Sequence, residues 1–307
     1  MTGFPAYDLG RFAADPGSAA EVDAICRETG FLVLTGHGVP PQTIAAMWAA
    51  VRAFFTQDPS QKAAVRPPRP GAPYGWLGPQ AEALARSRGE DTPPDLKESF
   101  NGGPLDVPAD ASEAARAFCY QPTPWPDLPG FRPAWEAYYT AMGDLAARIM
   151  QVFAVALGLP RDHFASVLRH PVSALRALHY PATANRPEDR QQRAGAHTDY
   201  GSLTILLPQP GSSGLQVHTC GAWVDVPAPE GAFIVNIGDL MARWTADRWV
   251  STLHRVEARA DQPARMSLAF FHQPDWDAEI TPLDGSDAYP PVRSGPYLMD
   301  RFRAAST

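Results

Sequence analysis

The sequence is poor in cysteine, has no cluster of basic residues and contains no long apolar run. Its three cysteines, Cys26, Cys119 and Cys220, are odd in number and widely scattered. Such a set predicts no disulfide framework and fits a reducing cytoplasm, with each thiol acting as a small apolar group. No apolar run reaches the length of a membrane-spanning helix, and the first residues lack the pattern of a secretory signal. We therefore expect a cytoplasmic protein that does not enter the membrane.

Positive charge is also in short supply. The 307 residues include 26 Lys and Arg against 33 Asp and Glu, so the net charge is −7 at pH 7. Because no basic patch exists, nucleic acid is not an expected partner. Hydrophobic residues make up 45% of the chain, which is enough for one large core, and we expect a single domain over residues 1–307. The sequence leaves the oligomeric state unknown.

The first half of the chain carries the helix signals. Three segments have apolar residues at helical spacing or clear start and stop residues: 18–29, 41–57 and 134–157. Two Pro-rich stretches are predicted to be surface loops: 66–79 and 121–133. Residues 1–170 are therefore expected to be mostly helical with loops.

From about residue 173 the apolar pattern becomes alternating, in short runs separated by Pro, Gly and Asp. The runs are 173–181, 202–209, 214–218, 222–228, 232–239, 251–258 and 265–274. This all-β pattern is consistent with a jelly roll closed into a barrel. We place that core at residues 171–280 and regard 281–307 as a C-terminal extension.

Two histidines and one aspartate form the most informative pattern. His197 and Asp199 are two residues apart, so on a strand they would point to the same side, and His254 follows more than fifty residues later. Two imidazoles and one carboxylate are the facial ligand set of non-haem Fe(II), which leaves open positions for substrate and dioxygen. The same donors also suit Zn(II), so a zinc-binding cupin is an alternative.

Arg265 and Ser267 add a carboxylate-binding pattern after the last histidine. They would share one strand face by the same period of two. A guanidinium can bind a carboxylate through two parallel hydrogen bonds, and a hydroxyl can add a third. An enzyme that presents a keto acid to iron needs such a pair, and a zinc-binding cupin would not explain it. A surface ion pair is the alternative for Arg265.

Longer segments around these residues resemble iron(II)- and 2-oxoglutarate-dependent oxygenases of the isopenicillin N synthase-like family. The segments are 30–39 (GFLVLTGHGV), 96–100 (LKESF), 197–207 (HTDYGSLTILL), 214–217 (GLQV), 231–245 (GAFIVNIGDLMARWT), 251–256 (STLHRV) and 265–271 (RMSLAFF). Their order and spacing match over most of the chain. The resemblance implies a mainly β fold with flanking helices around a double-stranded β-helix (jelly-roll, cupin-like) core.

The resemblance also implies a reaction and its cofactors. His197, Asp199 and His254 would bind Fe(II), while Arg265 and Ser267 would hold 2-oxoglutarate. The enzyme would consume O2 and 2-oxoglutarate, release succinate and CO2, and oxidise an unactivated C–H bond of a small molecule. Hydroxylation is the default outcome, and desaturation or cyclisation would need the same ligands.

Two features of the match bear on the cosubstrate. Tyr180 corresponds to the tyrosine that binds 2-oxoglutarate in many relatives, although a core aromatic is the alternative. Relatives often have Asn two residues earlier, where this chain has Leu178, so one hydrogen bond to the cosubstrate is absent. Some family members keep Arg-x-Ser without using 2-oxoglutarate. A 2-oxoglutarate-independent oxidase or cyclase, or a non-catalytic binding protein of the same fold, therefore stays open.

Substrate contacts are expected from the loop region 72–101. Tyr74, Trp76, Phe100 and Asn101 could line a small organic pocket, because such pockets combine apolar walls with a few polar groups. Ordinary packing is the alternative for each of them. Residues 77–95 are rich in Pro, Gly and charge, and the sequence does not decide whether they form a lid.

Overall fold

The computed structural model describes residues 4–185, 187–227 and 229–306. Within them, eight strands form a large sheet in the order β1-β2-β10-β7-β12-β5-β4-β3. The strands are β1 (Ala6–Asp8), β2 (Phe31–Thr35), β3 (Gly75–Leu77), β4 (Glu98–Gly102), β5 (Ala174–Tyr180), β7 (Leu203–Pro208), β10 (Phe233–Ile237) and β12 (Arg265–His272). Each pair is antiparallel except β1 with β2.

A second sheet of four strands packs against the large one. Its order is β6-β11-β8-β9, with bounds β6 (Ala194–His197), β8 (Leu215–Thr219), β9 (Ala222–Asp225) and β11 (His254–Val256). An apolar cluster joins the two sheets, with Leu178 and Ala269 from the large sheet and Val217 and Val256 from the small one. This arrangement confirms the predicted jelly roll. One residue of the predicted run 222–228, residue 228, lies outside the described residues.

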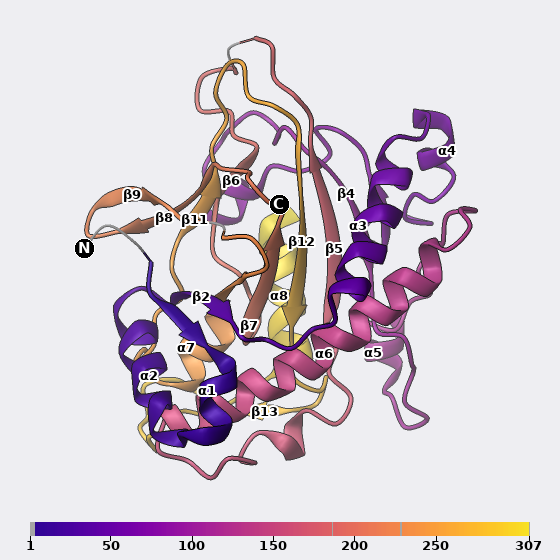
Figure 1. The fold of residues 1–307 in the computed structure, drawn as a ribbon. Helices are drawn as coiled ribbons and strands as arrows, with labels where there is room; N and C mark the ends of the chain where they lie inside the picture. Colours follow the sequence, from indigo (N-terminus) through magenta and orange to yellow (C-terminus); the bar gives the residue numbers. More distant parts are fainter. Residues whose placement is uncertain (1–3, 186, 228, 307) are drawn as a thin grey trace.

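Helices cover the other face of the large sheet. The long helix α6 (Phe131–Ala156) and its neighbours α2 (Ala19–Glu28) and α3 (Pro41–Phe55) enclose the main core (Figure 1). In α6, Trp135, Met142 and Leu145 are fully buried, because the apolar stripe predicted for this segment faces the sheet. Gly30 ends α2 at φ +63°, and a Cβ there would meet the Val250 carbonyl oxygen at 2.0 Å, so glycine is required.

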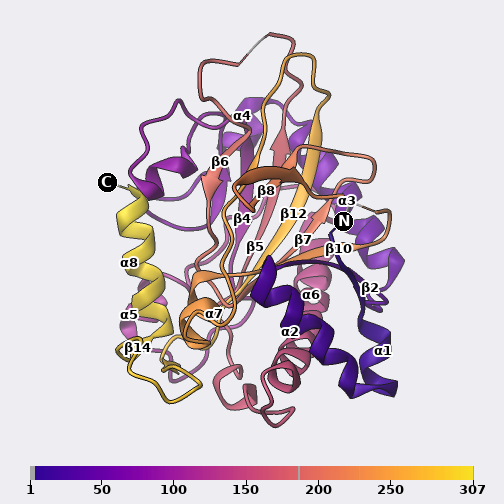
Figure 2. The ribbon, with the colours of Figure 1, turned by 90° about the vertical axis from the view of Figure 1, so that its left-hand side faces the viewer.

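The remaining elements are short, apart from the last helix. They are α1 (Leu9–Ala14), η1 (Pro16–Ser18), α4 (Pro59–Ala63), η2 (Leu84–Arg88), α5 (Glu113–Ala117), η3 (Ala165–Val167), α7 (Asp239–Trp244), β13 (Glu279–Ile280), β14 (Val292–Arg293) and α8 (Ser294–Ser306). Figures 1 and 2 together place α8 on the opposite side of the large sheet from α3 and α6. None of the helices in the described part of the chain has the length and apolarity that a membrane crossing requires.

Two features add to the sequence-based expectations. Residues 1–170 are mostly helices and loops but also contain β1, β2, β3 and β4, which widen the large sheet, and β3 lies inside the Pro-rich stretch 66–79. The extension 281–307 contains the helix α8, which packs against η2. Sequence patterns missed β3 and α8 because the first is very short and the second mixes polar and apolar residues.

Candidate active site

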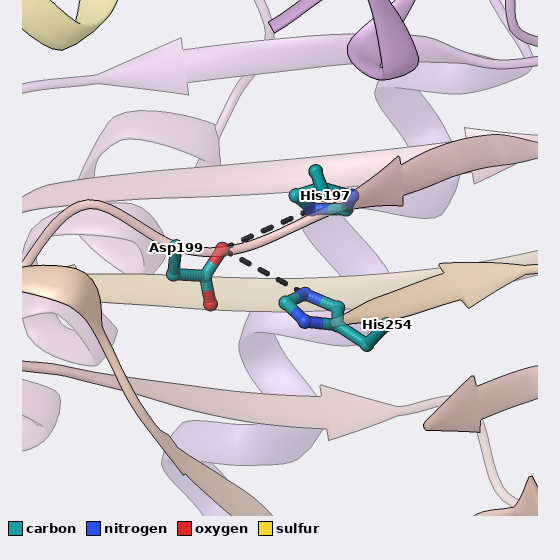
Figure 3. A group of neighbouring side chains, drawn as sticks. All are labelled: His197, Asp199 and His254. Carbon is teal, nitrogen blue, oxygen red and sulfur yellow. Dashed lines mark ion pairs between the residues drawn. The ribbon is translucent and has the colours of Figure 1, made fainter. Parts of the chain in front are cut away.

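His197, Asp199 and His254 converge in the space between the two sheets, as predicted. His197 is the last residue of β6 and pairs directly with His254, the first residue of β11. Asp199 follows β6 after its end, so the turn rather than strand alternation presents its carboxylate. The ligand atoms of the three side chains all lie within 4.8 Å of one another. Asp199 Oδ1 is 3.8 Å from the Nε2 atom of each histidine (Figure 3).

Backbone carbonyls orient both imidazoles. His197 Nδ1 lies 2.7 Å from the Gly195 oxygen, and His254 Nδ1 lies 3.1 Å from the Thr252 oxygen. A carbonyl oxygen only accepts hydrogen bonds, so each Nδ1 carries the proton and each Nε2 keeps its lone pair. Both free Nε2 atoms face Asp199. This is the tautomer that a metal ligand needs.

Asp199 is held in a matching orientation. Its second oxygen, Oδ2, accepts hydrogen bonds from Thr204 Oγ1 at 2.6 Å and from Asn236 Nδ2 at 2.7 Å. Burial raises the pKa of Asp199, but the two imidazoles and these hydrogen bonds outweigh it, so the net pKa lies below the usual value. Burial, and then the charge of His254, lower the pKa of His197 to about 3. Neutral imidazole and ionised carboxylate are the protonation states that bind Fe(II), and the site fits that metal.

Arg265 and Tyr180 lie side by side where β12 pairs with β5, and Ser267 follows two residues further along β12. Arg265 pairs with Tyr180 across β12 and β5, and its guanidinium lies 5.0 Å from the tyrosine ring centroid. Arg265 is only 4% exposed. Its Nη1 donates to the Ser213 carbonyl at 3.0 Å, whereas Nε is buried without a partner and no acidic side chain among the described residues pairs with it. A buried guanidinium without a carboxylate is unfavourable, so an anionic ligand such as 2-oxoglutarate fits here.

Sequence reasoning missed several residues that support the site. Thr204 and Asn236, which fix Asp199, are two of them. Arg193 is 2% exposed, and its Nη2 donates to the carbonyl oxygens of Pro181 at 2.9 Å and Pro263 at 2.7 Å. It thereby ties together the end of β5 and the approach to β12. Asn236 is a lone polar residue in an apolar strand, which was a usable signal, whereas Arg193 belongs to no pattern.

The four predicted substrate contacts separate into two groups. Phe100 is fully buried against Phe54 and Trp135 on the helix side of the sheet, and Trp76 Nε1 donates to Glu98 Oε2 in the same layer. These two side chains face away from the histidines, which contradicts the predicted substrate contact. Phe100 packs against α6, and the Trp76 ring lies beneath the cationic groups of Lys62 and Arg66.

The other two predicted substrate contacts, Tyr74 and Asn101, have different surroundings. The Tyr74 hydroxyl donates to the Cys119 carbonyl at 2.6 Å, and its ring lies against the Gly103 backbone. Both partners lie outside the barrel strands, so Tyr74 also has a structural role. Asn101 points to the barrel side of β4, and its substrate role stays a prediction. Two further polar side chains of the region 72–101, Arg86 and Arg88, belong to η2, which packs beside β6.

The fold and this constellation define a non-haem iron oxygenase, and comparisons with known proteins agree. Residues 171–274 match the family model of the 2OG-Fe(II) oxygenase superfamily, and residues 4–128 match the model "non-haem dioxygenase in morphine synthesis N-terminal". The chain belongs to the 2OG-Fe(II) oxygenase superfamily.

Individual relatives extend over nearly the whole chain. Validamycin A dioxygenase of Streptomyces hygroscopicus is 35% identical over 98% of this chain and 86% of the relative. The 2-oxoglutarate-dependent dioxygenase caaD of Aspergillus niger is 37% identical over 92% of this chain and 84% of the relative. The crystal structure of a Neurospora crassa protein in complex with alpha-KG and thymine has a TM-score of 0.84 and 29% identity, covering 99% of this chain and 96% of that chain. The protein is therefore an Fe(II)- and 2-oxoglutarate-dependent dioxygenase that uses O2.

Proposed function

We propose that His197, Asp199 and His254 bind the iron, that Arg265, Ser267 and Tyr180 bind 2-oxoglutarate, and that the enzyme hydroxylates a small molecule. The observation that carries the first assignment is the pair of free Nε2 atoms opposite Asp199 Oδ1. The second assignment rests on the buried guanidinium of Arg265 beside Tyr180, whose Nε has no hydrogen-bond partner and which no acidic side chain among the described residues neutralises. We further propose that residues 1–307 form a single domain. We also propose a cytoplasmic location, which the scattered, unpaired cysteines support.

The bound metal and cosubstrate would supply oxidative decarboxylation of 2-oxoglutarate coupled to insertion of oxygen into a C–H bond. The overall balance puts one oxygen atom of O2 into the new hydroxyl group and the other into succinate, with CO2 as the third product. The residues of the chain contribute orientation and dryness. Arg265 would neutralise the distal carboxylate of 2-oxoglutarate, Asp199 and the two histidines would hold the metal, and the buried surroundings would exclude water.

Small-molecule chemistry is supported by two features. Thymine is bound in the structural relative from Neurospora crassa, and validamycin A is named in the bacterial relative. The net charge of −7 does not favour nucleic acid as a partner.

Anaerobic spectroscopy tests the proposal. Fe(II) followed by 2-oxoglutarate should give the weak visible charge-transfer band of the chelate in the wild-type protein. His197→Ala should abolish iron binding. Arg265→Gln should weaken 2-oxoglutarate binding on the order of 100-fold, since it removes one partner of a buried charge pair. Arg132→Gln, at an exposed ion pair on α6, is the matched control. Iron binding without a band in the wild-type protein would refute the cosubstrate assignment.

A further inference from the structure

The strand β4 presents two different faces. Phe100 lies in the helix-side core, and a Cβ on Gly102 would meet Trp135 Nε1 at 2.8 Å, so these alternate residues face α6. Ser99 and Asn101 therefore face the inside of the barrel. Ser99 is aligned with Leu178 on β5, which is in turn aligned with Ser267 on β12. The inner face of β4 thus continues the sheet surface that carries the proposed cosubstrate residues.

Asn101 and Ser99 have buried polar groups without partners. Asn101 is 4% exposed, and neither Oδ1 nor Nδ2 has a hydrogen-bond partner among the described residues. Ser99 is fully buried, and its Oγ likewise has none. Buried amide and hydroxyl groups are nearly always hydrogen-bonded, so such a pair on one strand face calls for a ligand. One carboxamide side chain offers a donor and an acceptor side by side.

The neighbouring charges determine what kind of ligand fits. Arg176 lies directly across from Asn101, and its Nη1 is 3.2 Å from Glu82 Oε1. Lys97, on the same face of the chain as Ser99, is 2.6 Å from Asp95 Oδ2 and 3.5 Å from Glu82. Two cations and two carboxylates therefore neutralise one another inside the protein. A ligand group placed here does not need a charge.

The same surface borders the metal site and has an aromatic wall. Lys97 lies 2.6 Å from Asp95 Oδ2, and Asp95 Oδ1 accepts a hydrogen bond from the backbone N–H of Gly195 at 2.9 Å, two residues before His197. This face is therefore linked to the strand that carries a proposed metal ligand. Phe271 is aligned with Thr204, the residue that holds Asp199, so its side chain is on the inner face too. Phe271 is half-buried and offers a flat apolar surface to a planar ring.

We propose that Asn101 and Ser99 bind the substrate, and that the substrate is a neutral planar ring with a lactam or imide edge. The N–H and C=O groups of such an edge would pair with Asn101 Oδ1 and Nδ2, and the Ser99 hydroxyl would bind a further polar atom of the ring. Arg176, already paired with Glu82, lies across from Asn101 on β5 and borders that side of the site. This inference rests on the proposed function, because it names the substrate class of that same iron site.

Anaerobic calorimetry with uracil as the probe tests the proposal. Uracil should bind to the metal-free protein and to the enzyme loaded with Fe(II) and 2-oxoglutarate, whereas the neutral polyol myo-inositol and the anionic ring benzoate should not. Asn101→Asp keeps the shape but removes the donor, and it should weaken uracil binding about 10- to 100-fold. Ser99→Ala should weaken it about fivefold, as expected for one neutral hydrogen bond. Asn185→Asp, at an exposed position, is the matched control and should change nothing.

The outcomes separate this inference from the proposed function. The charge-transfer band reports on iron and 2-oxoglutarate and should be the same in Asn101→Asp and in the wild-type protein. A normal band together with no uracil binding, or with tighter binding of myo-inositol or benzoate, would overturn the substrate class. Unchanged uracil affinity in both Asn101→Asp and a second variant, Asn101→Ser, would overturn the role of Asn101. Absence of the band in the wild-type protein would instead count against the proposed function.

Discussion

Asn236 donates a hydrogen bond to the oxygen of Asp199 that faces away from the two histidines, at 2.7 Å. This contact leaves Asp199 Oδ1 as the oxygen that lies 3.8 Å from both Nε2 atoms. Thr204 donates to the same oxygen as Asn236. Residues of the large sheet therefore orient the carboxylate, whereas both histidines belong to the small sheet.

We predict that Asn236→Leu lowers the affinity for Fe(II) about 10- to 100-fold, because partners that orient a metal-binding carboxylate typically have effects of this size. Thr204→Val should act in the same direction. Anaerobic titration with Fe(II) measures the affinity, and Asn185→Leu at an exposed position is the control. Wild-type iron affinity in both Asn236→Leu and Thr204→Val would show that Asp199 does not depend on these contacts.

His272 should make the metal-free protein less stable in acid. Burial lowers the pKa of His272 from 6.5 to about 4, and its Nδ1 lies 2.8 Å from Ser202 Oγ. Above pH 6.5 the imidazole is neutral in both the folded and unfolded states and has no effect on the pH dependence. As the pH falls from about 6.5 to about 4, the unfolded chain takes up a proton that the folded protein does not. The free energy of unfolding should therefore fall by about 3 kcal/mol across this range.

Urea unfolding at several pH values measures this effect. Between about pH 6.5 and pH 4, the free energy of unfolding of His272→Gln should fall by about 3 kcal/mol less than that of the wild-type protein, because glutamine does not titrate. The comparison of the two proteins cancels the contribution of the other histidines. Parallel curves for the two proteins would show that His272 takes up a proton equally well in the folded state.

Side-chain contacts hold the C-terminal helix α8 close to Asp199, one of the proposed metal ligands. Arg301 on α8 forms an ion pair with Asp239 and lies 5.1 Å from the Tyr200 ring centroid. Asp239 Oδ2 also accepts a hydrogen bond from Thr198 Oγ1 at 3.2 Å, next to Asp199 in the chain. Because α8 packs against η2, Arg301→Gln should speed hydrogen exchange in both α8 and η2 by at least about tenfold, the effect of losing roughly 1.4 kcal/mol of local stability.

Hydrogen exchange followed by mass spectrometry measures this coupling. Arg303→Gln is the matched control, because Arg303 is exposed and its partner Asp300 lies on the same helix. Iron affinity should stay within about threefold of wild type, since Arg301 does not touch the ligands. Faster exchange in α8 without any change in η2 would show that the two segments move independently.

Phe100 should matter for stability and not for substrate binding. It is fully buried among Phe54, Phe131 and Trp135. Phe100→Ala should lower the free energy of unfolding by about 3–5 kcal/mol, as large-to-small changes of buried Phe do. The uracil affinity of the folded fraction should remain within about threefold of wild type. A large loss of uracil affinity at unchanged stability would restore the substrate role first expected for this residue.

Local patterns predicted much of the barrel. The alternating runs around 173–181, 202–209 and 265–274 correspond to β5, β7 and β12, because one face of each strand packs on the helices and the other lies inside the barrel. The helices α2, α3 and α6 were also predicted, with α6 beginning three residues earlier than expected, at Phe131 rather than residue 134. The strand β4 was missed, since all five of its residues are buried and no alternation of polarity is visible.

The sequence by itself predicted the candidate metal ligands and the segments that form the barrel strands, because these predictions depend on residue type, spacing and alternation. The class of chemistry followed from the family resemblance of those segments. Only the tertiary structure decided how the carboxylate of Asp199 is turned, which charges surround Asn101, and which way Phe100 and Trp76 point. Those properties depend on contacts between different segments, such as Asn236 of β10 with Asp199, β3 with β4, and β4 with β5. A change of one residue in such a pairing moves a side chain to the other face of the sheet, and local sequence does not encode that choice.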